Sequence, residues 1–80
     1  MSYISPQVVG DCKLMTEKYK HFLLVQLDAN TKRNVVSWVK ACSMVLNIKQ
    51  VILNLNVLPL GSYDVLIGMV WMDCHQVIIN

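Results

Sequence analysis

Side chains that could carry chemistry are few and scattered in this sequence of 80 residues. Cys74 and His75 are adjacent, so they could form a nucleophile with its base or two ligands of a metal. Neighbouring side chains on a strand or helix point in different directions, however, and rarely converge on one atom. The pattern instead predicts a buried Cys74 and surface histidines at positions 21 and 75.

The other cysteines add no recognisable site. Three cysteines are an odd number, they lie far apart in the chain, and they form no Cys-x-x-Cys pair. Neither a disulfide framework nor a zinc site is therefore indicated. We expect no metal and no cofactor.

The composition limits the classes of protein to consider. Apolar residues make up 55% of the chain and charged residues 15%, and the net charge is +2 with no run of lysines. Such a charge does not indicate nucleic-acid binding. A chain of this length forms one domain, residues 1–80, and buries only about 60% of its unfolded surface, so we expect a partner chain to cover part of it.

No segment resembles a membrane anchor or a secretion signal. The N-terminus lacks a basic region followed by an apolar stretch. The longest apolar stretch, Val51–Leu60, contains two asparagines and a proline and is far shorter than the roughly 20 residues of a spanning helix. We expect no membrane partner and, given the unpaired cysteines, a reducing cytoplasmic location.

The first half of the chain predicts a short helix and a hairpin. Ser5 followed by Pro6 is typical of a helix start, and Gly10 limits its length. Alternating apolar residues predict a strand over Phe22–Leu27. The polar residues that follow predict a hairpin tip leading to a second strand, Arg33–Cys42.

The second half of the chain is also predicted to consist mostly of β-strands. The fourth strand, Val51–Val57, has one apolar face and a partly wet face with Asn54 and Asn56, and Pro59 ends it. The remaining expected elements are a third strand over Met44–Ile48, a hairpin turn over Asn47–Gln50, a turn over Gly61–Asp64, a buried strand over Val65–Ile67, one or two helical turns over Met69–His75, and a strand over Val77–Ile79.

Three stretches resemble one family in the same order and spacing. Leu58–Met72, LPLGSYDVLIGMVWM, resembles the LPLGGYDVILGMDWL signature of the protease region in gypsy-type LTR-retrotransposon polyproteins. Ser2–Pro6 is similar to the HSFISP stretch of that family, and Val25–Leu27 with Thr31-Lys32 is similar to its VQLANGTK hairpin. The resemblance extends from Ser2 to about Asn80.

The elements above predict a mostly β domain with two short helices. The resemblance implies a retropepsin-like closed β domain, which works as a homodimer on extended peptides during polyprotein processing. It implies that the hairpin tip is a flap that contacts substrate. The flap residues are Leu27, Asp28, Ala29, Asn30, Thr31 and Lys32. The residues of the fold signature are Pro59, Gly61, Tyr63, Asp64, Gly68 and Trp71.

Catalysis in that family rests on one Asp per chain in an Asp-Ser/Thr-Gly turn. The Asp and its twin across a two-fold axis share a proton and activate water. None of the four aspartates here is followed by Ser/Thr-Gly: Asp11, Asp28, Asp64 and Asp73. The family places this turn just before the HSFISP stretch, which here means upstream of Met1. We therefore expect no catalytic residue in these 80 positions.

A second departure from the family is Val70, where the signature has Asp. That Asp would begin the C-terminal helix, so its loss would cost about 0.5–2 kcal/mol of capping. We expect an inactive fragment of an aspartic endopeptidase that lacks the first strand and the catalytic loop. Two alternatives are a working peptidase whose catalytic loop lies upstream of Met1 and a domesticated, non-catalytic peptide-binding or dimerisation module.

Overall fold

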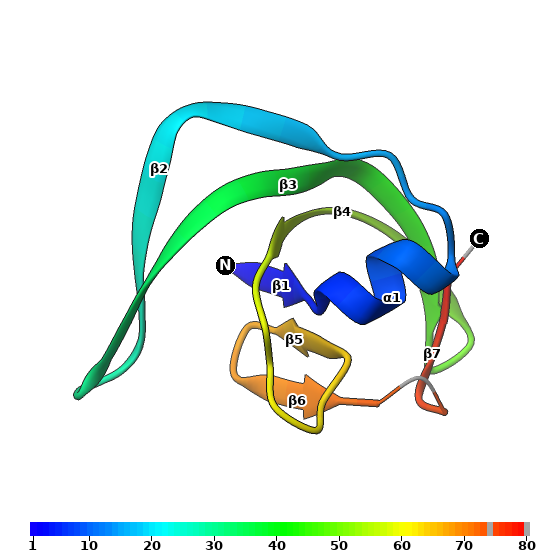
Figure 1. Cartoon of the computed structure of the whole chain (residues 1–80). Helices are drawn as coiled ribbons and strands as arrows, with labels where there is room; N and C mark the ends of the chain where they lie inside the picture. Colours follow the sequence, from blue (N-terminus) through cyan, green and yellow to red (C-terminus); the bar gives the residue numbers. More distant parts are fainter. Residues whose placement is uncertain (74, 80) are drawn as a thin grey trace.

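The structure, a computed structural model, describes residues 1–73 and 75–79, which form seven strands and one short helix (Figure 1). The expected mostly β domain is confirmed. The elements in chain order are β1 (Ser2–Ile4), α1 (Pro6–Asp11), β2 (Glu17–Asp28), β3 (Thr31–Leu46), β4 (Lys49–Val57), β5 (Val65–Ile67), β6 (Val70–Met72) and β7 (Val77–Ile79).

The strands form one sheet in the order β2-β3-β4-β1-β5-β6, and β7 pairs with β3. β1 lies in the middle, parallel to β4 and antiparallel to β5. Figure 1 shows the sheet curling around β1 and α1, with the β2–β3 hairpin arching over the outside. β2 and β6 are the two end strands of this path, and the sheet that curls between them has the shape of a half-barrel (Figure 1).

The predicted helix begins where the sequence indicates. The Oγ of Ser5 accepts a hydrogen bond from the backbone N–H of Val8 at 3.3 Å, and proline occupies the first turn. At its end, the N–H of Leu14 donates to the carbonyl of Val9 at 3.0 Å, and Lys13 adopts a φ of 52°. These bonds satisfy helix-end carbonyls in a Schellman arrangement, so α1 stops after six residues.

The predicted hairpin is confirmed, but its second strand is longer than expected. The third strand, predicted as separate over Met44–Ile48, is as far as Leu46 the continuation of β3. A bulge joins the two parts: the register shifts between Val39 and Cys42, and Ala41 has a φ of 51°. Asn54 holds this bulge, because its Oδ1 accepts a hydrogen bond from the N–H of Ala41 at 2.9 Å.

The turn between β3 and β4 lies where predicted. Leu46 pairs with Lys49, which leaves Asn47 and Ile48 as a two-residue loop. Both have a positive φ, 47° and 64°, as a type I′ turn requires. Asparagine suits this conformation well, whereas a β-branched isoleucine does not.

One face of β4 differs from the prediction. Asn56 was expected on a partly wet face, but it is only 8% exposed. Its Oδ1 accepts a hydrogen bond from the hydroxyl of Tyr19, and the Tyr19 ring stacks on Trp38 with ring centroids 6.2 Å apart. The aromatic pair buries Asn56 and satisfies it, which is why an amide is tolerated there.

The predicted C-terminal helix over Met69–His75 is wrong for the described residues. Residues Val70–Met72 form β6, which pairs antiparallel with β5. Gly68, with a φ of 60°, begins the two-residue turn between them, a position where glycine has no steric penalty. The capping cost predicted for Val70 therefore does not apply, and Cys74 lies outside the described residues.

The buried side chains form two clusters, and β1 contributes to both because successive side chains alternate. Ile4 belongs to the first cluster, which includes Val8 of α1 and Leu55 of β4. Tyr3 belongs to the second, which joins the hairpin to β5 and includes Val25, Val35, Leu58, Leu60 and Leu66. This second cluster forms the floor of the site described below.

Candidate functional site

A cavity of about 350 Å³ lies between the β2–β3 hairpin and the β5–β6 turn. Four consecutive residues of β2, Leu24–Leu27, line it. Side chains alternate along a strand, so lining by consecutive residues means that the backbone edge of β2 borders the cavity. Trp71 of β6 also lines it, so the cavity lies between the two end strands of the half-barrel. The remaining lining residues are Met1, Tyr3, Leu66, Gly68 and Met69.

The lining carries no charged side chain. Its polar side-chain groups are the amide of Gln26, the hydroxyl of Tyr3 and the indole N–H of Trp71. Burial raises the pKa of Tyr3 above its ordinary value, so this hydroxyl stays protonated. Such a cavity suits an uncharged, apolar side chain, and the edge of β2 offers backbone hydrogen bonds beside it.

A row of paired residues builds the floor of the cavity. Leu66 is the register partner of both Tyr3 and Trp71, so the three side chains lie on one face of the sheet. On the other side, Tyr3 is the partner of Asn56, which in turn faces Trp38. Sequence reasoning missed Tyr3 and Leu66 because their proximity depends on the pairing of β1 with β5.

The predicted flap residues divide between the cavity and the hairpin tip. Leu27 lines the cavity, whereas Asp28–Lys32 form the two-residue turn and the pairs next to it. The carboxylate of Asp28 accepts a hydrogen bond from the N–H of Asn30 at 2.8 Å. This bond, with a further one from the Thr31 side chain, lowers the pKa of Asp28. The acidic group thus stabilises its own turn, as aspartate often does.

The predicted signature residues also separate into two places. Gly68 and Trp71 line the cavity. Pro59, Gly61, Tyr63 and Asp64 instead line a more open cavity of about 790 Å³ beside α1.

The backbone of this loop is anchored on both sides. The N–H of Ser5 donates to the carbonyl of Asp64 at 2.9 Å, and the N–H of Asp64 donates to the carbonyl of Met72 at 2.9 Å. The signature therefore fastens the loop before β5 to the start of α1 and to β6, while its last residues reach the site.

The four aspartates occupy separate places. Asp11 ends α1, Asp28 lies at the hairpin tip, Asp64 lies in the turn before β5 and Asp73 follows β6. None of them lines the cavity beside β2. Asp73 accepts a hydrogen bond from the N–H of His75 at 2.9 Å, which stabilises a turn.

The histidines and cysteines that the structure describes provide no further centre. His21 and His75 are exposed, as predicted. Of the described cysteines, Cys12 is exposed and Cys42 is buried, and burial raises the pKa of the Cys42 thiol. Within residues 1–73 and 75–79, no group of three His, Cys, Asp or Glu side chains could hold a metal ion. Nor does any helix there have the length and apolarity needed to cross a bilayer.

Comparison with known proteins gives one family. A family model described as retroviral aspartyl protease matches residues 1–80. No curated protein and no solved structure matches the chain.

Proposed function

Because the chain belongs to the retroviral aspartyl protease family, we propose that it forms the peptide-binding part of a retropepsin-like aspartic endopeptidase and does not hydrolyse peptides by itself. The observation that carries this proposal is the cavity between the edge of β2 and Trp71, whose lining side chains carry no charge and include no aspartate. An extended peptide would place an apolar side chain in the cavity and pair its backbone with β2.

Peptide hydrolysis in this family depends on an Asp-Ser/Thr-Gly turn, which these 80 residues do not contain. Hydrolysis by this family needs two carboxylates close together, one protonated and one ionised, to activate water and polarise the scissile carbonyl. A single chain contributes one of them and a two-fold dimer supplies both. None of the four aspartates in this sequence is followed by Ser/Thr-Gly, which would aim it. We assign the chain to a gypsy-type polyprotein, in the cytoplasm, on the resemblance of its signatures.

The direct test is peptide cleavage by the 80-residue chain at mildly acidic and neutral pH, with and without a statine-type inhibitor. We expect no inhibitor-sensitive cleavage. The matched control variants are Asp11→Asn, Asp28→Asn, Asp64→Asn and Asp73→Asn, each of which should behave like the parent chain. Cleavage by the parent chain that one of these substitutions abolishes would overturn the proposal.

A second candidate is a non-catalytic peptide-binding module. The observation that favours it is that the cavity is formed entirely by residues outside any catalytic turn. Binding of an extended apolar peptide by the 80-residue chain, without cleavage, would support this function. Failure to bind any such peptide would exclude it.

The third reading, a working peptidase, is tested on the coding sequence upstream of Met1. If that sequence encodes an in-frame Asp-Ser/Thr-Gly-Ala, the chain extended to include it should dimerise and cleave peptides. The same extended chain with Asn in place of the loop Asp is the control and should be inactive. An extended chain that stays inactive would exclude this reading.

A further inference from the structure

The outer face of the β2–β3 hairpin combines exposed apolar side chains with lysines. Phe22, Leu24 and Val36 are 59%, 58% and 61% exposed. Leu24 is the register partner of Asn34, and Phe22 and Val36 lie two residues further along their strands, so the three apolar side chains share a face. These three exposed side chains form an apolar patch on the outer face, beside the polar Asn34.

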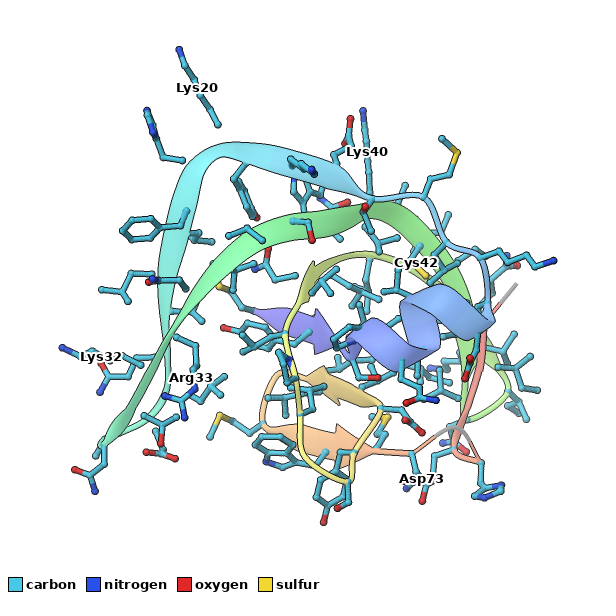
Figure 2. The ribbon with its side chains drawn as sticks, in the orientation of Figure 1. Lys20, Lys32, Arg33, Lys40, Cys42 and Asp73 are labelled. Carbon is cyan, nitrogen blue, oxygen red and sulfur yellow. The ribbon has the colours of Figure 1, made fainter. Side chains whose placement is uncertain are left out.

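Lysines lie at both ends of this patch. Lys32 is the register partner of Gln26, two residues from Leu24 on the same face, toward the hairpin tip. Figure 2 shows Lys20 and Lys40 projecting outward from the top of the arch, toward the other end of the hairpin.

The charges of the chain are unevenly divided. Residues 17–46, the hairpin, hold five of the seven basic residues and two of the five acidic residues. Both of those acids, Glu17 and Asp28, lie at the ends of β2. Glu17 pairs with Trp38, two residues from Lys40, and Asp28 pairs with Thr31, next to Lys32, so acidic side chains also lie near both ends of the hairpin. Residues 17–46 nevertheless carry more positive than negative charge, so a partner that covers the outer face gains from negative charge of its own.

We propose that the outer face of the β2–β3 hairpin, with Phe22, Leu24 and Val36 between Lys20 and Lys40 at one end and Lys32 at the other, binds an acidic polypeptide segment with an apolar centre. Such a segment covers the apolar patch with its middle and pairs carboxylates with the lysines at its ends. From Lys20 to the Gln26–Lys32 pair the strand spans about 20 Å, which an extended segment of six to eight residues matches.

Two other anionic partners fit this face less well. β2 is an end strand, so its outer backbone groups beside Phe22 and Leu24 would have no hydrogen-bond partner in a lipid layer, at a cost of several kcal/mol. Nucleic acid would pair with the lysines and could stack a base on Phe22, but the other two apolar side chains of the patch, Leu24 and Val36, offer no ring for stacking. A peptide satisfies both the charges and the apolar side chains.

The test measures binding of a fluorescein-labelled peptide, Glu-Glu-Leu-Val-Phe-Val-Glu-Glu, to the 80-residue chain by fluorescence anisotropy. We expect binding that weakens with salt and is lost when the four Glu of the peptide are replaced by Lys. The double variant Lys20→Glu/Lys40→Glu should bind about tenfold more weakly, and Phe22→Ser/Val36→Ser similarly. Circular dichroism establishes that each variant is folded.

The matched control is Lys49→Glu/Ile52→Ser, which changes a cation and an exposed apolar side chain of β4 outside this face. It should bind the peptide like the parent chain. Equal loss in the control, equal binding of the Lys peptide or no binding at all would overturn the proposal.

Two further probes separate the anionic partners. Vesicles of phosphatidylcholine and phosphatidylserine in about a 3:1 ratio, and an oligouridylate, should compete with the acidic peptide only weakly. Stronger binding of the vesicles or of the oligouridylate than of the acidic peptide would also overturn the proposal. Leu24 belongs both to this face and to the lining of the cavity beside β2, but none of the substituted residues lines that cavity. A loss of binding in these variants therefore reports on the outer face and not on the proposed peptidase function.

Discussion

Leu27 and Trp71 line the same cavity, although one belongs to the hairpin and the other to β6 at the opposite end of the strand order. The curl of the sheet brings the two end strands to the same cavity, and the floor between them is the row from Tyr3 to Leu66. The cavity therefore depends on the whole half-barrel.

Replacing Trp71 tests the cavity. Trp71→Ala removes the largest apolar group of its wall, and we expect about tenfold weaker binding of an extended apolar peptide, measured by fluorescence anisotropy. Trp71 also contacts Tyr63, with ring centroids 5.4 Å apart, so the thermal transition of the variant has to be recorded as well. Ile52→Ala on β4 is the control, and an equal loss of binding in that variant would show that the cavity is not the site.

Removing the hydroxyl of Tyr19 tests the burial of Asn56. Tyr19→Phe keeps the stack on Trp38 but leaves the Oδ1 of a buried amide without its donor, so the free energy of unfolding should fall by about 1–3 kcal/mol. Urea denaturation measures this. The more exposed Tyr63 provides the comparison: Tyr63→Phe should change stability by less than about 0.5 kcal/mol, and a similar loss in both variants would contradict the assignment.

The turn between β3 and β4 predicts a stabilising substitution. Ile48 is 95% exposed and has a φ of 64°, which strains a β-branched residue. Ile48→Gly should raise the free energy of unfolding by about 1 kcal/mol, because an Asn-Gly pair fits a type I′ turn. Ile48→Ala retains a Cβ at the same φ and should gain less. If alanine stabilises as much as glycine, backbone strain is not the cause.

The hairpin tip predicts a pH dependence. The N–H of Asn30, followed by the Thr31 side chain, lowers the pKa of Asp28 in the folded chain. A carboxyl whose pKa is lower in the folded than in the unfolded chain stabilises the fold above its unfolded pKa, and this contribution is lost as pH falls through the folded pKa.

NMR titration of the Asp28 carboxyl should therefore give a pKa below that of a model peptide. Thr31→Val removes one of the hydrogen bonds and should raise this pKa part of the way back, whereas Asn30→Ala, which keeps its backbone N–H, should shift it less. An Asp28 pKa at or above the model-peptide value would contradict the hydrogen-bond assignment.

Much of the fold was predictable because its signals are local. A hydroxyl cap before proline defined the start of α1 at Ser5, and alternating apolar residues defined the strands around Val25 and Leu55. The resemblance correctly indicated the retroviral aspartyl protease family. The homodimer remains a prediction.

The wrong predictions concern segments whose structure depends on contacts with residues that are distant in the sequence. One or two helical turns are predicted over Met69–His75, but Val70 and Trp71 are good strand formers, and β5 supplies their backbone partners. The strand predicted separately over Met44–Ile48 is, as far as Leu46, the end of β3, which continues through a bulge at Ala41. Asn54, thirteen residues away, holds that bulge, and no local signal reveals this contact.

The sequence by itself determined the β class, the helix start, the hairpin turns and the lack of an Asp-Ser/Thr-Gly turn within these residues, because each depends on side chains that are close in the chain. Only the tertiary structure decided which residues share the cavity, that Asn56 is buried, and that the apolar and basic side chains of the hairpin lie on one outer face. These depend on strand pairing and on the curl of the sheet, which bring together residues with no local signal of their proximity.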